Sequence, residues 1–286
     1  MGCIARILIS DLDLKRHKMN DSEKPIGIFD SGLGGLTVLK EVRKLLPNES
    51  LIYFGDSGRA PYGTKSGETV RAYTKQDIAF LLSKGVKAVV VACNTAAACA
   101  GRDLLDSFGV PVVDVIGAGS EEAVRVTSKG KIGVIGTSAT VNSGVYERAI
   151  KKLLPGAEFK AKACPLFVPL VEEGWWDNDI TYEVAKKYLC DIDGVDTLVL
   201  GCTHYPYLEN VIQKVAGADV TLVNSAKAVA LKLDKTLEKQ GLKKKGGAAT
   251  TEYFTSDSVE KFAALGELFL GDLGGNVSRA DTEAFS

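Results

Sequence analysis

Short apolar segments alternate with longer amphipathic ones from Pro25 to about Leu270, and this alternation most constrains the possible folds. Segments such as 26–29 and 86–92 are almost wholly apolar, as strands covered by helices on both faces are. Strands separated by helices of about ten residues or more are typical of right-handed βαβ units and parallel sheets. We therefore predict an α/β protein whose parallel sheets are flanked by helices.

A few segments interrupt or end this alternation. Residues 110–116 are predicted to form a strand, and residues 165–174 an irregular connection. The lysine-rich run 243–247 is predicted to be a solvated loop, because runs of like charge are usually exposed. The polar tail from Gly271 is predicted to be frayed.

The pattern of the first half begins again near the middle of the chain. Ile26-Gly27-Ile28 opens the first half and Ile132-Gly133-Val134 the second, and a turn and a helix follow each of them. Later in each half an apolar strand ends in a cysteine, Cys93 in one half and Cys202 in the other. The similarity predicts two similar α/β lobes, with a chance match of a common sequence pattern as the alternative.

The composition excludes several classes of protein. The chain has 286 residues and a formal net charge of −1, so it lacks the basic field that attracts nucleic acid or an anionic membrane. No apolar run approaches the roughly 18 residues of a membrane span. The six cysteines include no Cys-x-x-Cys pair and are too few for a disulfide scaffold, and the two histidines are too few for a His-rich metal centre. We expect a cytoplasmic protein with no metal site and no nucleic-acid or membrane partner.

Residues 1–24 precede the periodic pattern and form an N-terminal extension that we expect to be disordered. Their short apolar stretch runs into a charged segment without a small-residue cleavage site, so they do not resemble a signal peptide. Met19 is an alternative start of the native chain, in which case residues 1–18 are not translated.

Two of the cysteines occupy positions where an active site is expected. Cys93 and Cys202 each follow a buried strand and precede a helix, and ligands bind at the carboxyl ends of parallel strands. If the two lobes face each other, the two thiols reach one cleft from opposite sides. That arrangement suits two-base proton transfer at a carbon stereocentre, in which a thiolate removes a proton from one face and a thiol protonates the other. Of the other four cysteines, Cys3 lies in the N-terminal extension, and Cys99, Cys164 and Cys190 are predicted to be small buried hydrophobic residues.

A free cysteine is only a few per cent ionised at neutral pH, so this chemistry needs neighbouring groups. A helix N-terminus contributes typically about 0.3–1 kcal/mol, less than the roughly 2 kcal/mol needed to lower a thiol pKa by about 1.5 units. His204 can stabilise the Cys202 thiolate when protonated, or accept its proton when neutral. Asp30 ends the first strand and is predicted to lie beside Cys93, where it can accept or relay the thiol proton.

Polar residues beside the two thiols suit an amino-acid ligand. Asp30-Ser31 and the glycines after them offer a hydroxyl and backbone N–H groups to a carboxylate, with a plain tight turn as the alternative. Asn94-Thr95 and Thr203-His204 can bind a ligand or cap the helices that follow, and neither role excludes the other. Tyr62-Gly63 lies in a long loop where an active-site loop is expected, with a surface turn as the alternative.

The motifs around these residues resemble those of the glutamate racemases, in the aspartate/glutamate racemase superfamily. The match extends from about residue 25 to residue 269, and the motifs together are highly specific. It rests on Ile26-Gly27-Ile28-Phe29-Asp30-Ser31-Gly32-Leu33-Gly34-Gly35-Leu36-Thr37-Val38, Pro61-Tyr62-Gly63, Ala92-Cys93-Asn94-Thr95-Ala96, Gly136-Thr137 and Gly201-Cys202-Thr203-His204-Tyr205-Pro206.

The resemblance implies cofactor-independent interconversion of L- and D-glutamate, which supplies D-glutamate for peptidoglycan. It implies that Cys93 and Cys202 are the acid/base residues, with Asp30 and His204 assisting. It also implies a homodimer and two lobes, residues 25–119 with 230–286 and residues 120–229, with the active site in the cleft between them. The substrate contacts that it implies are Asp30, Ser31, Tyr62, Gly63, Asn94, Thr95, Thr203 and His204.

Other functions stay open as alternatives. The nearest is an aspartate racemase or another two-cysteine racemase of the same superfamily, although His204 after Cys202-Thr203 favours the glutamate branch. A non-catalytic binding protein with two lobes has no need of paired cysteines. A hydrolase with a cysteine nucleophile needs one Cys–His pair rather than two matched cysteines.

Overall fold

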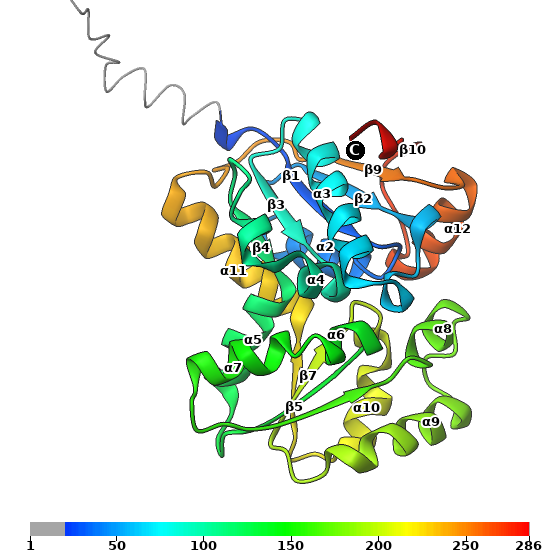
Figure 1. Ribbon diagram of the computed structural model, residues 1–286. Coiled ribbons are helices and arrows are strands. Elements are labelled where there is room, and N and C mark those ends of the chain that lie inside the picture. The colour runs from blue at the N-terminus through cyan, green and yellow to red at the C-terminus, as the bar shows by residue number, and fades with distance from the viewer. Residues whose placement is uncertain (1–20, 286) are drawn as a thin grey trace, which may run out of the picture.

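The computed structural model describes residues 21–285, which form two lobes (Figure 1). The alternative start at Met19 and most of the N-terminal extension lie outside these residues, and only residues 21–24 of the extension are described. Lys87 donates a hydrogen bond to the backbone carbonyl of Ser22 (2.6 Å), and Glu23 lies 3.5 Å from Lys244. The expected disorder is therefore wrong for these last residues of the extension, because they are held against the first lobe.

The first lobe is built on the parallel strands β1 (Ile26–Asp30), β2 (Leu51–Gly55), β3 (Ala88–Val91), β4 (Val112–Asp114), β9 (Thr251–Thr255) and β10 (Val277–Arg279). They lie in the order β10-β9-β2-β1-β3-β4, and the central strands β1 and β3 are wholly buried, as their apolar sequences predicted. Helices α3 (Gly67–Ser83) and α4 (Asn94–Leu105) pack together, and α2 (Leu36–Leu45) packs with α11 (Ser225–Gln240) and α12 (Val259–Leu270) (Figure 1).

The second lobe is built on the parallel strands β5 (Lys131–Gly136), β6 (Glu158–Ala163), β7 (Thr197–Gly201) and β8 (Thr221–Asn224). Its helices are α6 (Ser138–Asn142), α7 (Val145–Leu153), α8 (Phe167–Glu172), α9 (Asp179–Leu189) and α10 (Glu209–Ala216). The strand order β6-β5-β7-β8 is the order β2-β1-β3-β4 of the first lobe, so the two predicted α/β lobes share one topology. Within residues 21–285, no helix is long and apolar enough to cross a membrane.

The glycine in the Ile-Gly pair that opens each half is needed for the same packing reason in both lobes. A Cβ atom at Gly27 would lie 3.0 Å from the side chain of Leu81, and one at Gly133 would lie 2.7 Å from Ile192. Each glycine therefore allows a side chain outside the sheet to approach the first strand of its lobe closely. The repeat seen in the sequence thus reflects equivalent positions in two equivalent sheets.

Two helices carry the chain between the lobes. Helix α5 (Val115–Val126) leaves β4 directly, because Asp114 Oδ1 accepts a hydrogen bond from the Gly117 N–H (2.8 Å) and caps the helix. The predicted strand 110–116 was therefore too long, since its last two residues belong to α5. Helix α11 brings the chain back and packs against α5 and α2. The proposed lobe limits at 119/120 and 229/230 fall inside these two helices.

Two predictions of irregular structure were wrong, and the prediction of a solvated loop was wrong at one residue. Residues 165–174 contain α8, because Phe167 and Val171 are one helical turn apart and bury the same face. The tail from Gly271 contains β10, whose backbone groups pair with β9. The run 243–247 is a loop whose other residues are exposed, as predicted. Lys244 alone is buried in it, because its N–H donates to Glu49 (2.8 Å) and its ammonium group to the Ala248 carbonyl (2.9 Å). The errors at β10 and Lys244 involve contacts with residues that the local sequence pattern does not include.

Candidate active site

A cavity of about 760 Å³ lies between the two lobes, at the carboxyl ends of strands from both sheets. Its volume falls within the range of about 300–1,000 Å³ that is usual for small-molecule sites. Among residues 21–285, no group of three or more His, Cys, Asp or Glu side chains is placed to hold a metal ion. The predicted site residues that line the cavity are Ser31, Tyr62, Gly63, Cys93, Asn94, Thr95, Cys202, Thr203 and His204.

Cys93 follows β3 and caps the N-terminus of α4. Its Sγ accepts a hydrogen bond from the Ala96 N–H (3.4 Å) and donates one to Ser31 Oγ (3.5 Å). Burial and the negative charge of Asp30 raise the pKa of the Cys93 thiol to about 12, and the two hydrogen bonds only partly oppose them. Cys93 is therefore a protonated thiol at neutral pH, and its own neighbours do not supply the lowering of its pKa that the sequence led us to expect.

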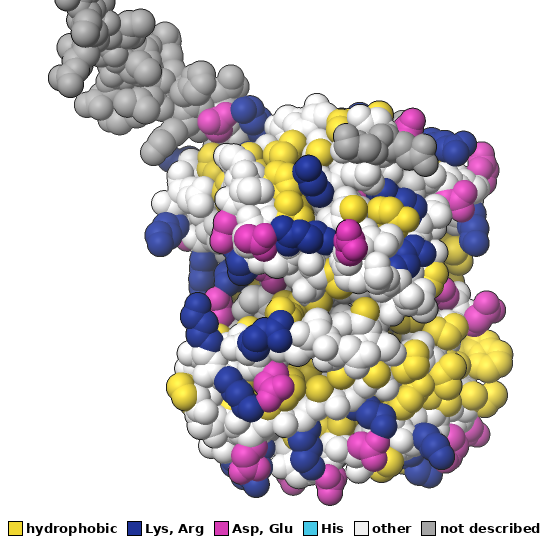
Figure 2. All heavy atoms as spheres, viewed as in Figure 1, with side chains coloured by type: hydrophobic (Ala, Val, Ile, Leu, Met, Phe, Trp, Pro, Cys, Tyr) yellow, Lys and Arg dark blue, Asp and Glu magenta, His cyan; other side chains and the backbone are white. Residues whose placement is uncertain are grey.

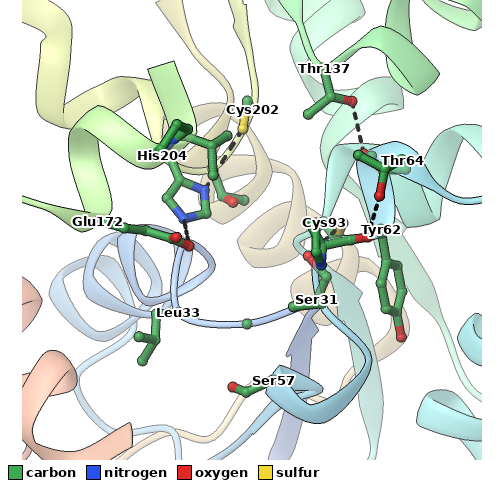
Figure 3. A pocket seen from close by; sticks show the side chains of 18 of the residues that line it. Ser31, Leu33, Ser57, Tyr62, Thr64, Cys93, Thr137, Glu172, Cys202 and His204 are labelled. Atoms are coloured by element: carbon green, nitrogen blue, oxygen red, sulfur yellow. Dashed lines mark hydrogen bonds and ion pairs between the residues drawn. The ribbon is translucent and has the colours of Figure 1, made fainter. Parts of the chain in front are cut away.

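Cys202 holds the equivalent position in the second lobe, directly after β7. Figure 3 shows Cys202 and His204 on one side of the cavity and Cys93 with Ser31 on the other. The Cys202 Sγ lies 3.9 Å from Nδ1 of His204. A short 3-10 turn, Tyr205–Leu208, follows the cysteine, and α10 begins only after it. The polar neighbour of this thiol is thus the imidazole rather than an α-helix N-terminus.

The other cysteines of the described chain differ in their surroundings. Cys164 is buried and Cys99 is partly buried, whereas Cys190 is exposed. The prediction of a small buried residue was therefore wrong for Cys190. It begins a 3-10 turn after the surface helix α9, where its thiol meets the Lys187 carbonyl (3.2 Å) instead of the core.

His204 is held between a thiol and a carboxylate. Its Nδ1 faces Cys202, and its Nε2 lies 3.2 Å from Glu172 Oε1 on α8. Burial by itself lowers the pKa of His204, but the contacts with Cys202 and Glu172 and the charge of Asp30 outweigh it and raise the pKa to about 10. A protonated imidazole at this place can stabilise a negative charge on the Cys202 sulfur.

We expect His204 to remain protonated at neutral pH and its imidazole to titrate with a pKa near 10 rather than 6.5. Nitrogen-15 NMR of the imidazole groups across a pH series measures this, and His204→Asn assigns the signal because the chain has only two histidines. Because the folded-state pKa is raised, the protonated ring stabilises the fold fully below about pH 6.5, and this contribution is lost as the pH rises through about 10. A His204 signal that titrates near pH 6.5 would contradict the pairing with Glu172.

Asp30 lies beside the cavity but not on its surface, since it is fully buried and absent from the lining. Its Oδ2 accepts a hydrogen bond from the Gly32 N–H (3.0 Å), and its Oδ1 accepts one from Thr203 Oγ1 (3.3 Å). Burial raises the pKa of Asp30 despite the positive charge of His204 and these hydrogen bonds. Its charge acts on Cys93, so the two lie close as predicted, and its part in proton transfer stays a prediction.

The glycine-rich turn after β1 contacts the loop of the second lobe that carries Cys202. The Thr37 hydroxyl is shared between the carbonyl oxygens of Gly34 (2.8 Å) and Thr203 (3.0 Å). A Cβ atom at Gly34 would lie 2.3 Å from Thr203 Oγ1 and 2.5 Å from His204 Nδ1. The turn therefore needs a glycine at position 34 because the other lobe approaches its backbone directly.

Hydroxyl groups from both lobes also meet across the cavity. Thr95 Oγ1 lies 3.0 Å from Thr137 Oγ1, and Thr137 caps α6 by accepting a hydrogen bond from the Thr140 N–H (3.2 Å). Because Cys93 itself caps α4, the capping role considered for Asn94 and Thr95 was wrong. Their side chains line the cavity instead.

Tyr62 lines the cavity, but its hydroxyl points into a buried polar network. The hydroxyl lies between the carboxylates of Asp56 and Asp77, at 2.9 Å from Asp77 Oδ2. Arg59 joins the same two carboxylates, at 2.6 Å from Asp56 and 2.7 Å from Asp77. Burial, with the charge of Asp56, raises the pKa of Asp77 well above its usual value. A ligand could therefore meet the ring of Tyr62 or the backbone of Tyr62 and Gly63, but not this hydroxyl.

Several lining residues escaped the analysis of the sequence. Glu172 comes from the stretch predicted to be irregular, and its partner His204 lies 32 positions further along the chain. Thr137 belongs to the Gly136-Thr137 motif, which was a usable signal, but no role was assigned to it. Lys261 and Phe262 come from α12, which the fold returns to the first lobe beside the cavity. No local pattern marked Glu172, Lys261 or Phe262 as site residues.

Comparisons with known proteins agree with this architecture. The model of the Asp/Glu/Hydantoin racemase family matches residues 34–233. A glutamate racemase of Geobacter metallireducens is 48% identical over 264 residues, which cover 91% of this chain and 98% of that protein.

Solved structures extend the comparison to the fold. A glutamate racemase isoform from Bacillus anthracis has a TM-score of 0.88 at 40% identity, with coverage of 91% of this chain and 98% of that one. A glutamate racemase from Francisella tularensis, solved in complex with D-glutamate, has a TM-score of 0.86 at 36% identity and covers 92% of this chain and 100% of its own. With a family model that matches most of its length and relatives this similar, the chain belongs to the Asp/Glu/hydantoin racemase family.

Proposed function

We propose that the protein is a glutamate racemase that interconverts L- and D-glutamate without a cofactor, by proton transfer through Cys93 and Cys202. The observation that carries this proposal is the pair of thiols that follow equivalent strands of two lobes and line one cavity. The choice of glutamate is supported by relatives that are 46–48% identical and are glutamate racemases.

The proposed reaction needs only the two sulfur atoms as proton carriers. One cysteine, as a thiolate, takes the α-proton and becomes a thiol, while the electron pair of the broken C–H bond stays on the α-carbon. The other cysteine, as a thiol, gives its proton to the opposite face of that carbon and becomes a thiolate. Protons and electrons balance, and the exchanged protonation states of Cys93 and Cys202 are those that the reverse reaction needs.

The neighbours of the two thiols differ, which supports different protonation states of Cys93 and Cys202 before the reaction. Cys202 has the raised-pKa imidazole of His204 at 3.9 Å, which can hold a proton while the sulfur carries charge. Cys93 is kept as a thiol by burial and by Asp30. An amino-acid substrate adds an α-ammonium cation to the site, and a nearby cation favours the ionised form of a thiol. We propose that the substrate thereby supplies part of the lowering that the Cys93 thiol pKa needs.

The proposed substrate contacts follow from the lining of the cavity. Ser31, Asn94, Thr95 and Thr203 present hydroxyl or amide groups that can bind the carboxylates and the ammonium group of glutamate. The backbone of Tyr62 and Gly63 is proposed to contribute from the loop after β2. Asp30 and His204 are proposed to assist proton transfer from beside the two thiols, as the contacts above allow.

The proposal also covers the location, the assembly and the cellular role of the enzyme. We propose a cytoplasmic homodimer that supplies D-glutamate for peptidoglycan, as the resemblance to glutamate racemases implies. Apolar side chains gather on the second lobe around α8 and α9, where Leu166, Trp175 and Ile180 are exposed (Figure 2). An exposed apolar surface of this kind supports association with another protein surface.

Incubation of the purified protein with L-glutamate or D-glutamate in D₂O tests the proposed function. We expect deuterium at the α-carbon and loss of optical rotation from either enantiomer, without an added metal or cofactor. A parallel incubation with each enantiomer of aspartate tests the alternative substrate. Absence of α-deuterium from both enantiomers of glutamate would reject the proposal, and exchange with aspartate alone would replace it with an aspartate racemase.

A further inference from the structure

A tyrosine of the second lobe forms a hydrogen bond with a residue beside Cys93 in the first lobe. The hydroxyl of Tyr146, on α7, donates a hydrogen bond to the side-chain Oδ1 of Asn94 at 2.7 Å. Both residues are buried, with 3% and 2% of their surface exposed. Asn94 begins α4 directly after Cys93 and lines the cavity. This hydrogen bond therefore connects the two lobes at one of the two proposed catalytic positions.

The other half of the Asn94 amide has no partner. Its Nδ2 is buried and makes no hydrogen bond to any of residues 21–285. A buried N–H group without a partner is costly in a folded protein, so such a group commonly marks a place where a ligand binds. The amide nitrogen carries two N–H donors and no acceptor, so the ligand group that it suits is an oxygen acceptor such as a carboxylate.

In the observed hydrogen bond the tyrosine hydroxyl is paired with the carbonyl side of the amide, which leaves the NH₂ group available. It has one proton, and donating that proton to Oδ1 requires the carbonyl side of the amide to face Tyr146. The NH₂ group must then face the other way. Without the hydroxyl, no hydrogen bond to Tyr146 favours one orientation of the Asn94 amide over the other. The orientation with Oδ1 away from Tyr146 would repel a carboxylate.

The ring of Tyr146 is held in place by residues next to the second thiol. A Cβ atom at Gly201, the residue before Cys202, would lie 3.3 Å from Tyr146 Cε2. A Cβ atom at Gly119, on α5, would lie 3.4 Å from the Tyr146 hydroxyl. The ring thus packs against the end of β7 and against α5, which leaves its hydroxyl directed at Asn94.

We propose that Tyr146 is a positioning residue that fixes the Asn94 amide with its NH₂ group toward a carboxylate of the bound amino acid. Tyr146 acts through Asn94 and does not itself take part in proton transfer. Because the ring packs beside Cys202 and the hydroxyl binds beside Cys93, it also ties the carboxylate site to the relative position of the two lobes. The inference rests on the proposed function for the identity of the substrate, although the amide orientation itself does not.

Tyr146→Phe removes one oxygen atom and tests this role. We expect KM for both enantiomers of glutamate to rise about tenfold, equivalent to about 1.4 kcal/mol, while kcat stays within about twofold, the pattern of lost substrate binding. Tyr253→Phe is the matched control, because Tyr253 is buried, donates to the Leu273 carbonyl (2.6 Å) and does not line the cavity. It is expected to lower thermal stability without changing KM. A change in kcat alone in Tyr146→Phe would overturn the proposal.

A double-mutant cycle separates action through Asn94 from a general structural effect. Asn94→Ala is expected to raise KM more than Tyr146→Phe does, and adding Tyr146→Phe to Asn94→Ala is expected to change KM no further. If Tyr146→Phe still raises KM in the Asn94→Ala background, the hydroxyl does not act through the amide and the proposal fails.

NMR of the Asn94 side chain provides a test that does not depend on activity. The wild-type NH₂ signals, assigned by their loss in Asn94→Asp, are expected to form a single set and to shift or broaden in Tyr146→Phe. Two sets in the wild type, or unchanged signals in the variant, would contradict the fixed orientation. If the wild type does not racemise glutamate, the proposed function fails, but these signals still decide whether Tyr146 orients Asn94.

Discussion

Replacing Cys93 or Cys202 by serine is expected to reduce racemisation of glutamate by about 10²–10⁴-fold or more in both directions, the usual scale of a lost acid/base group. In the proposed mechanism, each direction uses both sulfur atoms, one to remove the α-proton and one to return a proton to the opposite face. The serine hydroxyl is a far weaker acid than a thiol. The substituted serine therefore neither ionises readily to remove the α-proton nor readily gives its own proton to the α-carbon. Both single variants should therefore be impaired with L-glutamate and with D-glutamate.

A partial reaction distinguishes this mechanism from damage to the fold. A glutamate analogue with a leaving group on the β-carbon needs only removal of its α-proton for elimination, so each variant should eliminate from one enantiomer and not from the other. Cys99→Ser is a suitable control, since Cys99 is only partly buried and lies outside the cavity lining. Equal loss of racemisation and of both eliminations, with unchanged circular dichroism, would contradict a two-base mechanism.

Gly34→Ala is expected to lower kcat/KM by about 10²-fold, the scale expected when reacting groups are displaced by about 1 Å. The new Cβ atom would lie 2.3 Å from Thr203 Oγ1 and 2.5 Å from His204 Nδ1, closer than non-bonded atoms approach. The loop that carries Cys202 would have to move away from the first lobe. Because the conflict is between the lobes, each sheet can keep its own packing.

Thermal unfolding and kinetics together test this expectation. Gly109→Ala is the matched control, because a Cβ atom at that position would meet nothing within 4 Å. The control should retain activity, and Gly34→Ala should lose activity much more than it loses stability. Unchanged kinetics in Gly34→Ala would mean that the close approach of the Thr203–His204 loop to the turn is not needed for catalysis.

The two lobes share a topology, but their thiols have different surroundings. In the first lobe, burial and Asp30 raise the pKa of the Cys93 thiol. In the second lobe, His204 stands 3.9 Å from Cys202, with Glu172 on its other side. The internal repeat therefore predicts where the two sulfur atoms lie, but not which charged groups surround each of them. That difference comes from side chains at positions that the repeat does not share.

Much of the fold and of the site follows from local sequence. Apolar strands such as β3 and β7 are buried along their whole length, so their composition alone predicts them. The similarity of Ile26-Gly27-Ile28 to Ile132-Gly133-Val134 predicts the two similar lobes. The positions of Cys93 and Cys202 at the cavity follow from the same rule, because parallel strands present their carboxyl ends at one edge of a sheet. Their motifs also carry the family resemblance.

Only the tertiary structure decided how the side chains around the thiols act. Thr203 reaches Asp30 across 173 positions of sequence, and Tyr146 reaches Asn94 across 52. Helix α8, which supplies Glu172, is six residues long, so its buried face repeats only once, at Phe167 and Val171. The alternation of strands and helices reflects periodicity within short segments, which can be read directly from the amino-acid sequence. Hydrogen bonds and charge interactions between the lobes depend on how the two sheets are placed relative to one another, and no local pattern records that.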